Sequence, residues 1–268
     1  MRTELWLDYS TRSLETAGIS SARLDSLILL EDCLDKDRAH ILAHPEMIIS
    51  TTRLKKLNYR LKKRLKHEPM AYIRGYSEFY GRKFKINKHV LEPRPESEVM
   101  ISMLKKLHLS ENTVIADVGT GSGCLGITAT LETRCTKIDL YDIDASALAV
   151  AKHNSVMHEV GLKAYKRNLL NNNVRPYDIV MANLPYVPNK YKINKAAKRE
   201  PKLAIFGGAD GLDIYRKLFE QVLNLSRKPS YILTESMPPQ HSPLASIAKN
   251  SGYKLRITNQ LIQVFEPV

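Results

Sequence analysis

Four consecutive residues, Asn183-Leu184-Pro185-Tyr186, have side chains suited to holding a planar nitrogen. Asn183 offers an amide oxygen as a hydrogen-bond acceptor. Pro185 has no backbone N–H and stiffens the turn, so the carbonyl of Leu184 can point outward as a second acceptor. Two acceptors can hold both hydrogens of an NH2 group, while Tyr186 can stack on it and attract a nearby sulfonium methyl. The tetrapeptide therefore predicts methyl transfer to an amide or amino nitrogen, with Asn183, Pro185 and Tyr186 as catalytic residues.

This chemistry needs no general base before the transfer. An amide nitrogen is a poor nucleophile because its lone pair is delocalised into the carbonyl. Hydrogen bonds from its protons to fixed acceptors stabilise the positive charge that develops on nitrogen in the transition state. Alignment of nitrogen, methyl carbon and sulfur contributes through orientation. The proton can leave afterwards to water.

A glycine-rich segment, Asp117 to Gly123, lies upstream of the tetrapeptide with the sequence Asp-Val-Gly-Thr-Gly-Ser-Gly. Glycines let the backbone turn sharply and approach a ligand closely, and the following helix presents unpaired amide donors. Asp142 ends the next candidate strand, where a carboxylate can accept the ribose hydroxyls of a nucleoside. Asp144 is a second candidate for that role. Together these segments predict a nucleoside cofactor.

The glycine segment alone leaves a rival open. Gly121 to Gly126 also fits the dinucleotide fingerprint, and Asp142 lies at about the spacing that fingerprint requires, so a nicotinamide enzyme is an alternative. Asp117 opposes it, because an acid would repel a pyrophosphate but suits the cationic, amino-acid end of a sulfonium cofactor. A glycine turn without any ligand is the third interpretation.

The elements around these motifs predict a doubly wound α/β fold. Buried strands alternate with helical patterns, which implies a parallel sheet whose carboxyl edge carries the chemistry. Two further candidate strands are joined by a short turn and must pair antiparallel, as in Rossmann-like methyltransferases. Asn171 to Asn173 is expected to form a turn. The expected strands are Thr113–Val118, Lys137–Asp142, Tyr177–Ala182, Tyr231–Glu235, Tyr253–Ile257 and Leu261–Phe265.

The first part of the chain has a different pattern. Residues 1–71 are predicted to form a small helical domain, residues 72–92 a β-hairpin linker, and residues 93–268 the catalytic domain. Apolar stripes at helical spacing support the first assignment, namely Leu24, Leu27, Ile28 and Cys33, and then Leu54, Leu57, Leu61 and Leu65. The second stripe is flanked by eight Lys and Arg residues without an acid. That helix presents either a solvated face or a docking face for RNA or an acidic protein.

The composition narrows the class of protein further. Of 268 residues, 41 are Lys or Arg and 28 are Asp or Glu, and this formal charge of +13 favours an anionic partner. Three scattered cysteines, an N-terminus with early acids and the lack of a long apolar run indicate a reduced, cytoplasmic chain without a signal peptide or membrane span. The His residues do not cluster with Cys or acids at metal-ligand spacing, so no metal is expected.

The motifs together resemble the HemK/PrmC-type methyltransferases, which modify the side-chain amide (N5) of a glutamine in the Gly-Gly-Gln motif of peptide-chain release factors. The resemblance runs over nearly the whole chain. The segments that carry it are Ala17–Ile19, Glu68–Gly75, Phe79–Gly81, Val90–Glu98, Asp117–Gly123, Asp142, Asn183–Tyr186, and Glu200–Pro201 through Gly207–Leu212. It implies a Rossmann-like seven-stranded fold, S-adenosylmethionine as cofactor with S-adenosylhomocysteine as product, and a monomer whose helical domain grips a release factor.

The resemblance also assigns residues. It implies that Asn183, Leu184, Pro185 and Tyr186 hold the substrate, with Arg94 and Glu98 near the wall of the site. The basic N-terminal helix is a candidate for weak contact with RNA or the ribosome. The residues implied to bind the cofactor are Asp117, Gly119, Thr120, Gly121, Gly123, Asp142, Ile143, Asn168, Leu169 and Asn183.

Several positions depart from the family pattern. The family usually has Pro where Leu184 stands, and a Leu there resembles adenine-N6 methyltransferases that act on ribosomal RNA. Asn168 replaces a usual acid opposite the adenine amino group, and Glu92 replaces an aliphatic residue. The alternative is therefore an N6-adenine methyltransferase acting on RNA or DNA, because an adenine amino group is also a planar NH2 donor. A non-catalytic binding module is a third hypothesis, which intact Asn183 and Tyr186 oppose.

Overall fold

The computed structural model describes residues 1–172 and 175–268, and it divides into two compact units. Unit 1 comprises Met1–Gly75 and Asn194–Arg199, and unit 2 comprises Tyr76–Ile193 and Glu200–Val268. Of the turn expected at Asn171 to Asn173, the last residue lies outside the described residues. No sequence pattern indicated that 194–199 would join the N-terminal unit.

Among the described residues, unit 1 contains five α-helices and the short 3-10 helix η2 (Ala197–Arg199). The α-helices are α1 (Thr3–Thr16), α2 (Ala22–Leu34), α3 (Arg38–Ala43), α4 (Thr51–Leu65) and α5 (Met70–Arg74). Their core contains Trp6, Leu30 and Leu57, all fully buried. Leu24, expected in an apolar stripe of α2, is 46% exposed, whereas Leu27 and Cys33 of the same stripe are buried.

Three of the basic side chains in α4 form ion pairs with acidic residues of unit 1. Arg64 is buried and its Nε donates to Asp25 Oδ2 at 2.7 Å. Arg60 lies 3.8 Å from Asp32, and Lys63 lies 3.3 Å from Glu68. The cations that remain exposed are Arg53, Lys55, Lys56, Lys62 and Lys66.

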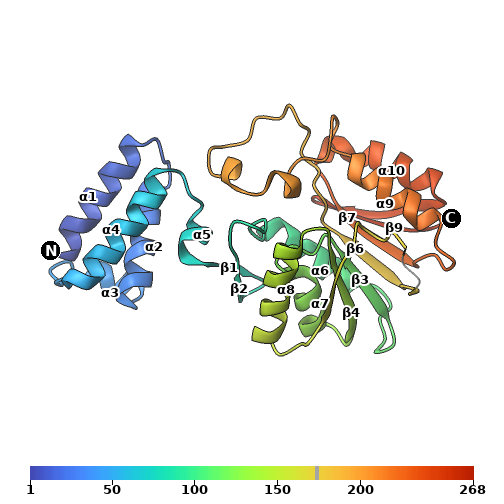
Figure 1. The fold of residues 1–268 in the computed structure, drawn as a ribbon, viewed down its shortest axis with the longest axis horizontal. Helices are drawn as coiled ribbons and strands as arrows, with labels where there is room; N and C mark the ends of the chain where they lie inside the picture. The colour runs from blue at the N-terminus through green and yellow to red at the C-terminus, as the bar shows by residue number, and fades with distance from the viewer. Residues whose placement is uncertain (173–174) are drawn as a thin grey trace. The chain divides into compact units, whose positions relative to one another are not determined.

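Unit 2 contains a seven-stranded sheet in the order β5-β4-β3-β6-β7-β9-β8. The first five of these strands are parallel, whereas β9 pairs antiparallel with both β7 and β8. This confirms the doubly wound sheet with one antiparallel hairpin (Figure 1). The strands are β3 (Val114–Val118), β4 (Lys137–Asp142), β5 (Lys163–Lys166), β6 (Ile179–Ala182), β7 (Tyr231–Glu235), β8 (Tyr253–Asn259) and β9 (Ile262–Pro267).

Helices cover both faces of the sheet (Figure 1). On one face lie α6 (Glu98–Leu104), α7 (Cys124–Glu132) and α8 (Ala145–Met157), and on the other α9 (Asp213–Leu223) and α10 (His241–Asn250). Strands buried on both sides read as continuous apolar runs, which is why β3 and β6 were recognisable in the sequence. Strand β5 was not predicted, because it is a short edge strand with mostly exposed residues.

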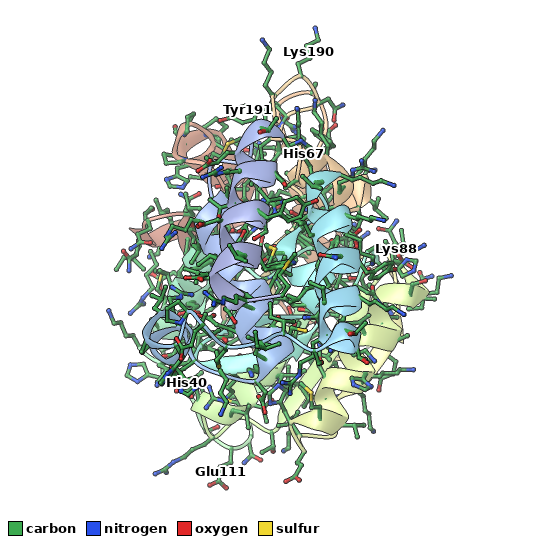
Figure 2. All side chains as sticks on the ribbon, turned by 90° about the vertical axis from the view of Figure 1, so that its left-hand side faces the viewer. His40, His67, Lys88, Glu111, Lys190 and Tyr191 are labelled. Atoms are coloured by element: carbon green, nitrogen blue, oxygen red, sulfur yellow. The ribbon has the colours of Figure 1, made fainter. Side chains whose placement is uncertain are left out.

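Shorter elements connect these layers. A two-stranded hairpin of β1 (Tyr76–Phe79) and β2 (Arg82–Lys85) opens unit 2. The 3-10 helices are η1 (Pro95–Ser97), η2 (Ala197–Arg199), η3 (Lys202–Ala204) and η4 (Pro238–Gln240). The segment between β6 and α9 carries Lys190 and Tyr191, whose side chains project outward in Figure 2.

Neither a metal-binding cluster nor a membrane-spanning helix is found among the described residues. The rings of His40 and His44 lie with their centroids 4.6 Å apart and are tilted by 47°. Residues 1–172 and 175–268 contain no group of three or more His, Cys, Asp or Glu side chains arranged to hold a metal ion. No helix in those ranges is long and apolar enough to cross a bilayer.

Candidate active site

A pocket opens at the carboxyl ends of β3, β4 and β6, where the motifs were expected to meet. Its lining includes the glycine segment, residues that precede α6 and residues of η3. The predicted site residues that line it are Arg94, Gly119, Thr120, Gly121, Asp142, Ile143, Asn168, Leu169, Asn183, Leu184 and Pro185. Asp117, Gly123, Tyr186 and Glu98 are not among its lining residues.

The glycine segment forms a tight loop between β3 and α7. The amides of Gly119 and Thr120 both donate to the carbonyl of Tyr141 at 2.9 Å, which ties the loop to β4. Gly119 adopts a φ of +73°, and a Cβ there would lie 2.8 Å from the Leu184 side chain. The loop can therefore lie against the tetrapeptide only because this position is glycine.

Asp117 braces this loop from behind. It is fully buried, and its Oδ2 accepts from Thr120 Oγ1 at 2.6 Å and from the Gly126 amide at 2.9 Å. Within the described chain its Oδ1 is buried without a hydrogen-bond partner. Gly126 leaves room for the carboxylate, since a Cβ there would lie 2.9 Å from Asp117 Oδ2.

Burial of Asp117 predicts a pH dependence of stability. Burial raises its pKa to about 6, so the folded state binds the proton more tightly than the unfolded chain. The stabilisation is present at low pH and is lost as the pH rises from about 4 to about 6. We expect the difference in unfolding free energy between wild type and Asp117→Asn to fall by about 2 kcal/mol over that interval. Urea denaturation of both proteins at pH 4, 5, 6 and 7 measures it, and a constant difference would contradict the assignment.

Asp142 stands at the pocket wall at the end of β4. Its Oδ2 accepts from the Gly121 amide and its Oδ1 from the Asp144 amide, both at 2.9 Å, and burial raises its pKa. Asp144, the second candidate for the ribose, also lines the pocket, and its Oδ1 caps α8 by accepting from the Ser146 amide at 2.7 Å. A carboxylate held by two backbone donors still has lone pairs for further donors.

The tetrapeptide follows β6 directly, and its polar groups are held from neighbouring elements. Asn183 Nδ2 donates to Ser97 Oγ at 2.9 Å and to Glu235 Oε2 at 3.0 Å. Tyr186 OH donates to Glu235 Oε1 at 3.0 Å, and burial raises the pKa of this phenol. The Leu184 amide, which a proline would lack, is satisfied by Tyr215 OH at 3.2 Å.

Arg94 and Glu98, which the family resemblance places near the wall of the site, differ in their positions: only Arg94 lines the pocket. Arg94 Nη2 donates to the buried carboxylate of Glu200 at 2.5 Å. Glu98 Oε1 accepts from the Tyr80 amide at 2.7 Å and so holds the turn of the β1–β2 hairpin. Glu92, which no sequence argument explained, donates its amide to Glu200 Oε2 at 3.1 Å.

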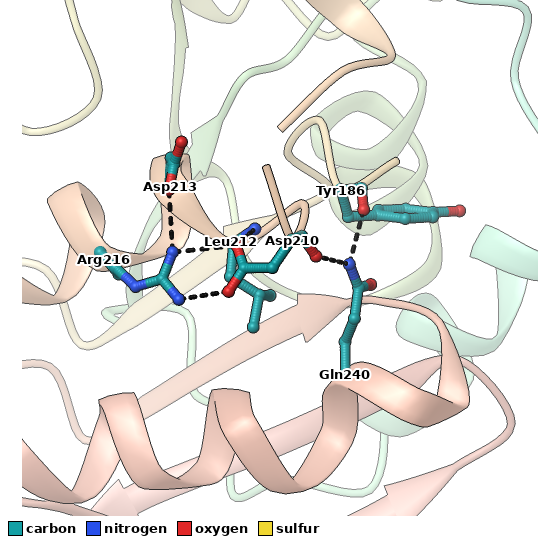
Figure 3. Close-up of polar contacts among 6 residues, drawn as sticks. All are labelled: Tyr186, Asp210, Leu212, Asp213, Arg216 and Gln240. Atoms are coloured by element: carbon teal, nitrogen blue, oxygen red, sulfur yellow. Dashed lines mark hydrogen bonds and ion pairs between the residues drawn. The ribbon is translucent and has the colours of Figure 1, made fainter. Parts of the chain in front are cut away.

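The segment Gly207–Leu212 braces the tetrapeptide (Figure 3). Gln240 Nε2 donates to the carbonyls of Tyr186, at 2.7 Å, and Asp210, at 2.8 Å. Asp210 is in turn bound by Arg216 and by the Leu212 amide. Figure 3 shows this chain of contacts running from Arg216 to Tyr186.

Ser97, Glu235, Tyr215 and Gln240 all contact the tetrapeptide, but sequence reasoning did not assign them a role. The only available signal was that Glu235 ends a predicted strand beside the one that precedes Asn183. Ser97 lies within the segment Val90–Glu98 that carries the family resemblance, but no role was assigned to it. Tyr215 and Gln240 lie in helical segments without any motif.

Solved structures with the same architecture define the class of fold. A ribosomal protein L11 methylase from Lactobacillus delbrueckii aligns with a TM-score of 0.51 at 15% identity, covering 72% of this chain and 90% of that protein. A methyltransferase from Pyrococcus furiosus aligns with a TM-score of 0.53 at 15% identity, covering 81% and 98%. The chain therefore has the fold of the Rossmann-like methyltransferases.

Sequence relatives identify the family within that class. The model of the PrmC N-terminal domain matches residues 6–75, and that of the methyltransferase small domain matches residues 95–200. The release factor glutamine methyltransferase of Coxiella burnetii is 33% identical, over 89% of this chain and 87% of that protein. That of Koribacter versatilis is 34% identical, over 85% and 84%. The chain belongs to the release factor glutamine methyltransferase family.

Another group of relatives is longer. A bifunctional methyltransferase of Rickettsia bellii is 29% identical over 96% of this chain, which spans about half (52%) of that protein's length. Membership of the release factor glutamine methyltransferase family also excludes the alternative interpretation of the glycine segment as part of a nicotinamide-dependent enzyme.

Proposed function

We propose that this chain transfers a methyl group from S-adenosylmethionine to the side-chain amide nitrogen of the glutamine in the Gly-Gly-Gln motif of peptide-chain release factors. The observation that carries the proposal is the orientation of Asn183 at the pocket. Its Nδ2 is bound to Ser97 and Glu235, so its Oδ1 is the atom left to accept a hydrogen bond. The names of the Coxiella and Koribacter relatives support the choice of acceptor.

The donor set at the pocket fits this cofactor. The Asp142 carboxylate would accept the ribose hydroxyls, and the loop from Gly119 to Gly121 would lie against the amino-acid end. Asn168 and Leu169 would border the adenine. The buried Oδ1 of Asp117, which has no partner among the described residues, suits a site that receives a cation. When bound, S-adenosylmethionine supplies the electrophilic methyl group, and S-adenosylhomocysteine remains.

The protein's part in the reaction is orientation and electrostatics. The Asn183 Oδ1 and the Leu184 carbonyl would accept the two hydrogens of the target NH2 group, and Tyr186 would cover its face. These acceptors stabilise the positive charge that develops on nitrogen and fix the nitrogen in line for attack. The proton leaves to water after the transfer. No residue is required as a base and no metal is needed.

The remaining assignments concern partners. Unit 1 would grip the release factor, and the exposed cations of α4 would make a weak contact with RNA or the ribosome, whose phosphates they complement. The protein would act as a monomer in the cytoplasm.

The test incubates the purified protein with methyl-labelled S-adenosylmethionine and two acceptors in parallel, a cognate release factor and total RNA. We expect label in the release factor, lost when the Gly-Gly-Gln glutamine is replaced by alanine. Label in RNA but not in protein would overturn the proposal in favour of an adenine-N6 methyltransferase and would make Leu184 the informative residue.

A further inference from the structure

Glu235 lies behind the tetrapeptide and holds two of its side chains at once. It ends β7, is 1% exposed, and stands beside β6 in the sheet, where Ala182 pairs with Thr234. Its Oε2 accepts from Ser97 Oγ at 2.6 Å and from Asn183 Nδ2 at 3.0 Å. Its Oε1 accepts from Tyr186 OH at 3.0 Å.

The polarity of these contacts fixes which end of Asn183 faces the substrate. An ionised carboxylate accepts hydrogen bonds and cannot donate them, so only the NH2 end of Asn183 can face it. Ser97 enforces the same choice, because its hydroxyl hydrogen is committed to Glu235 and only its lone pairs remain for Asn183. In the described part of the chain Asn183 Oδ1 accepts no hydrogen bond, and Asn183 lines the pocket.

We propose that Glu235 is a positioning residue that keeps the acceptor oxygen of Asn183 and the ring of Tyr186 turned toward the target nitrogen. The inference rests on the proposed function and deepens it. If the amide were reversed, its NH2 group would meet the NH2 group of the target and could accept neither hydrogen. Glu235 therefore acts through Asn183 and Tyr186 and does not touch the substrate.

The surroundings of Glu235 provide hydrogen-bond donors for its buried carboxylate. Burial and the nearby Glu96 raise its pKa, while the donors Ser97, Tyr186 and Asn183 oppose that rise. A carboxylate buried without donors would be strongly destabilising, and three hydrogen-bond donors offset that cost. The backbone amide and carbonyl of Glu235 are also held, both by Tyr215 OH.

The first test is Glu235→Gln, which keeps the shape but adds a donor where Asn183 and Tyr186 already donate. We expect kcat to fall about 10-fold or more, while the Kd for S-adenosylhomocysteine stays within about threefold because Glu235 does not line the pocket. A kcat within about threefold of wild type would overturn the proposal.

The second test reverses the polarity of the contact. Asn183→Asp alone places two carboxylates against each other, and we expect its Tm to fall by about 3 °C or more. In Asn183→Asp/Glu235→Gln the new amide donates to the carboxylate introduced at position 183, which again leaves an oxygen facing the pocket. We expect the double variant to recover both Tm and kcat relative to Asn183→Asp. If the losses of kcat and Tm in the two single variants simply added in the double variant, the direction of the hydrogen bond between the two side chains would not position residue 183.

These outcomes are separable from failure of the proposed function. If the wild type labels RNA and leaves the release factor unlabelled, the choice of acceptor is wrong, and the same kcat ratios measured on RNA still test Glu235. If neither acceptor is labelled, the Tm of the single and double variants decides. A double variant no more stable than Asn183→Asp then overturns the proposal.

Discussion

Replacing Asn183 by alanine is expected to lower kcat about 100- to 1,000-fold, the cost of removing one fixed group that stabilises charge in a transition state. The Leu184 carbonyl would remain as a single acceptor, so one hydrogen of the target NH2 group would lose its partner. The change also removes the donor that Glu235 and Ser97 receive. Because Asn183 is proposed to hold the target NH2 group, we expect the loss in kcat to be larger than any rise in the Kd for S-adenosylhomocysteine. Steady-state methyl transfer to the release factor, with calorimetry for the Kd, measures both.

Asn189→Ala is the matched control. Asn189 follows the tetrapeptide, and its backbone amide donates to the Gly208 carbonyl at 2.8 Å, while its side chain is exposed. Removing that side chain should leave kcat within about twofold of wild type. If Asn183→Ala retained kcat at the level of Asn189→Ala, the tetrapeptide would not hold the acceptor, and the proposed chemistry would be wrong.

The sequence predicted the parts of the site that are local in the chain. The glycine segment, Asp142 and the tetrapeptide each follow a buried apolar strand, and parallel strands bring their carboxyl ends to one edge of the sheet. That rule placed Gly119, Asp142 and Asn183 around one pocket, as the structure has them. The antiparallel end of the sheet was predicted for a similarly local reason, the short turn before β9.

The contacts that support the site could not be predicted, because they depend on strand order. Glu235 and Asn183 are 52 residues apart in the chain, and they meet only because β7 lies beside β6 in the sheet. Asp117 illustrates a different difficulty. An acid before glycines was interpreted as a cofactor contact; the structure shows its Oδ2 held by Thr120 and Gly126, while its buried Oδ1 has no partner among the described residues. No periodicity distinguishes a carboxylate that faces a ligand from one that braces the loop.

Glu98 and Asp144 show the same limit for polar residues near a motif. Asp144 lines the pocket and Glu98 lies close in the chain to residues that line it, yet one oxygen of each carboxylate accepts from a backbone amide, of Ser146 and Tyr80 respectively. Helix caps and hairpin turns compete with binding sites for Asp and Glu. The side chain that reaches the ligand is decided by backbone direction, which spacing alone does not give.

Replacing Asp142 by alanine is expected to weaken cofactor binding more than any other single change at the pocket. Two hydrogen bonds from ribose hydroxyls to a carboxylate contribute about 1.5–3 kcal/mol each, so loss of both acceptors should raise the Kd for S-adenosylhomocysteine about 100-fold or more. The Gly121 and Asp144 amides would also lose their acceptor, which loosens the loop. Isothermal titration calorimetry on each variant gives the Kd directly.

Two further variants separate these contributions. Asp142→Asn keeps one side-chain oxygen as an acceptor and should recover part of the affinity that Asp142→Ala loses. Glu111→Gln removes an exposed carboxylate that points away from the molecule in Figure 2 and should bind as wild type does. If Asp142→Ala bound S-adenosylhomocysteine as tightly as Glu111→Gln, the ribose would have to lie elsewhere. The end of β4 would then be no part of the cofactor site, and only the glycine loop and the tetrapeptide would still define it.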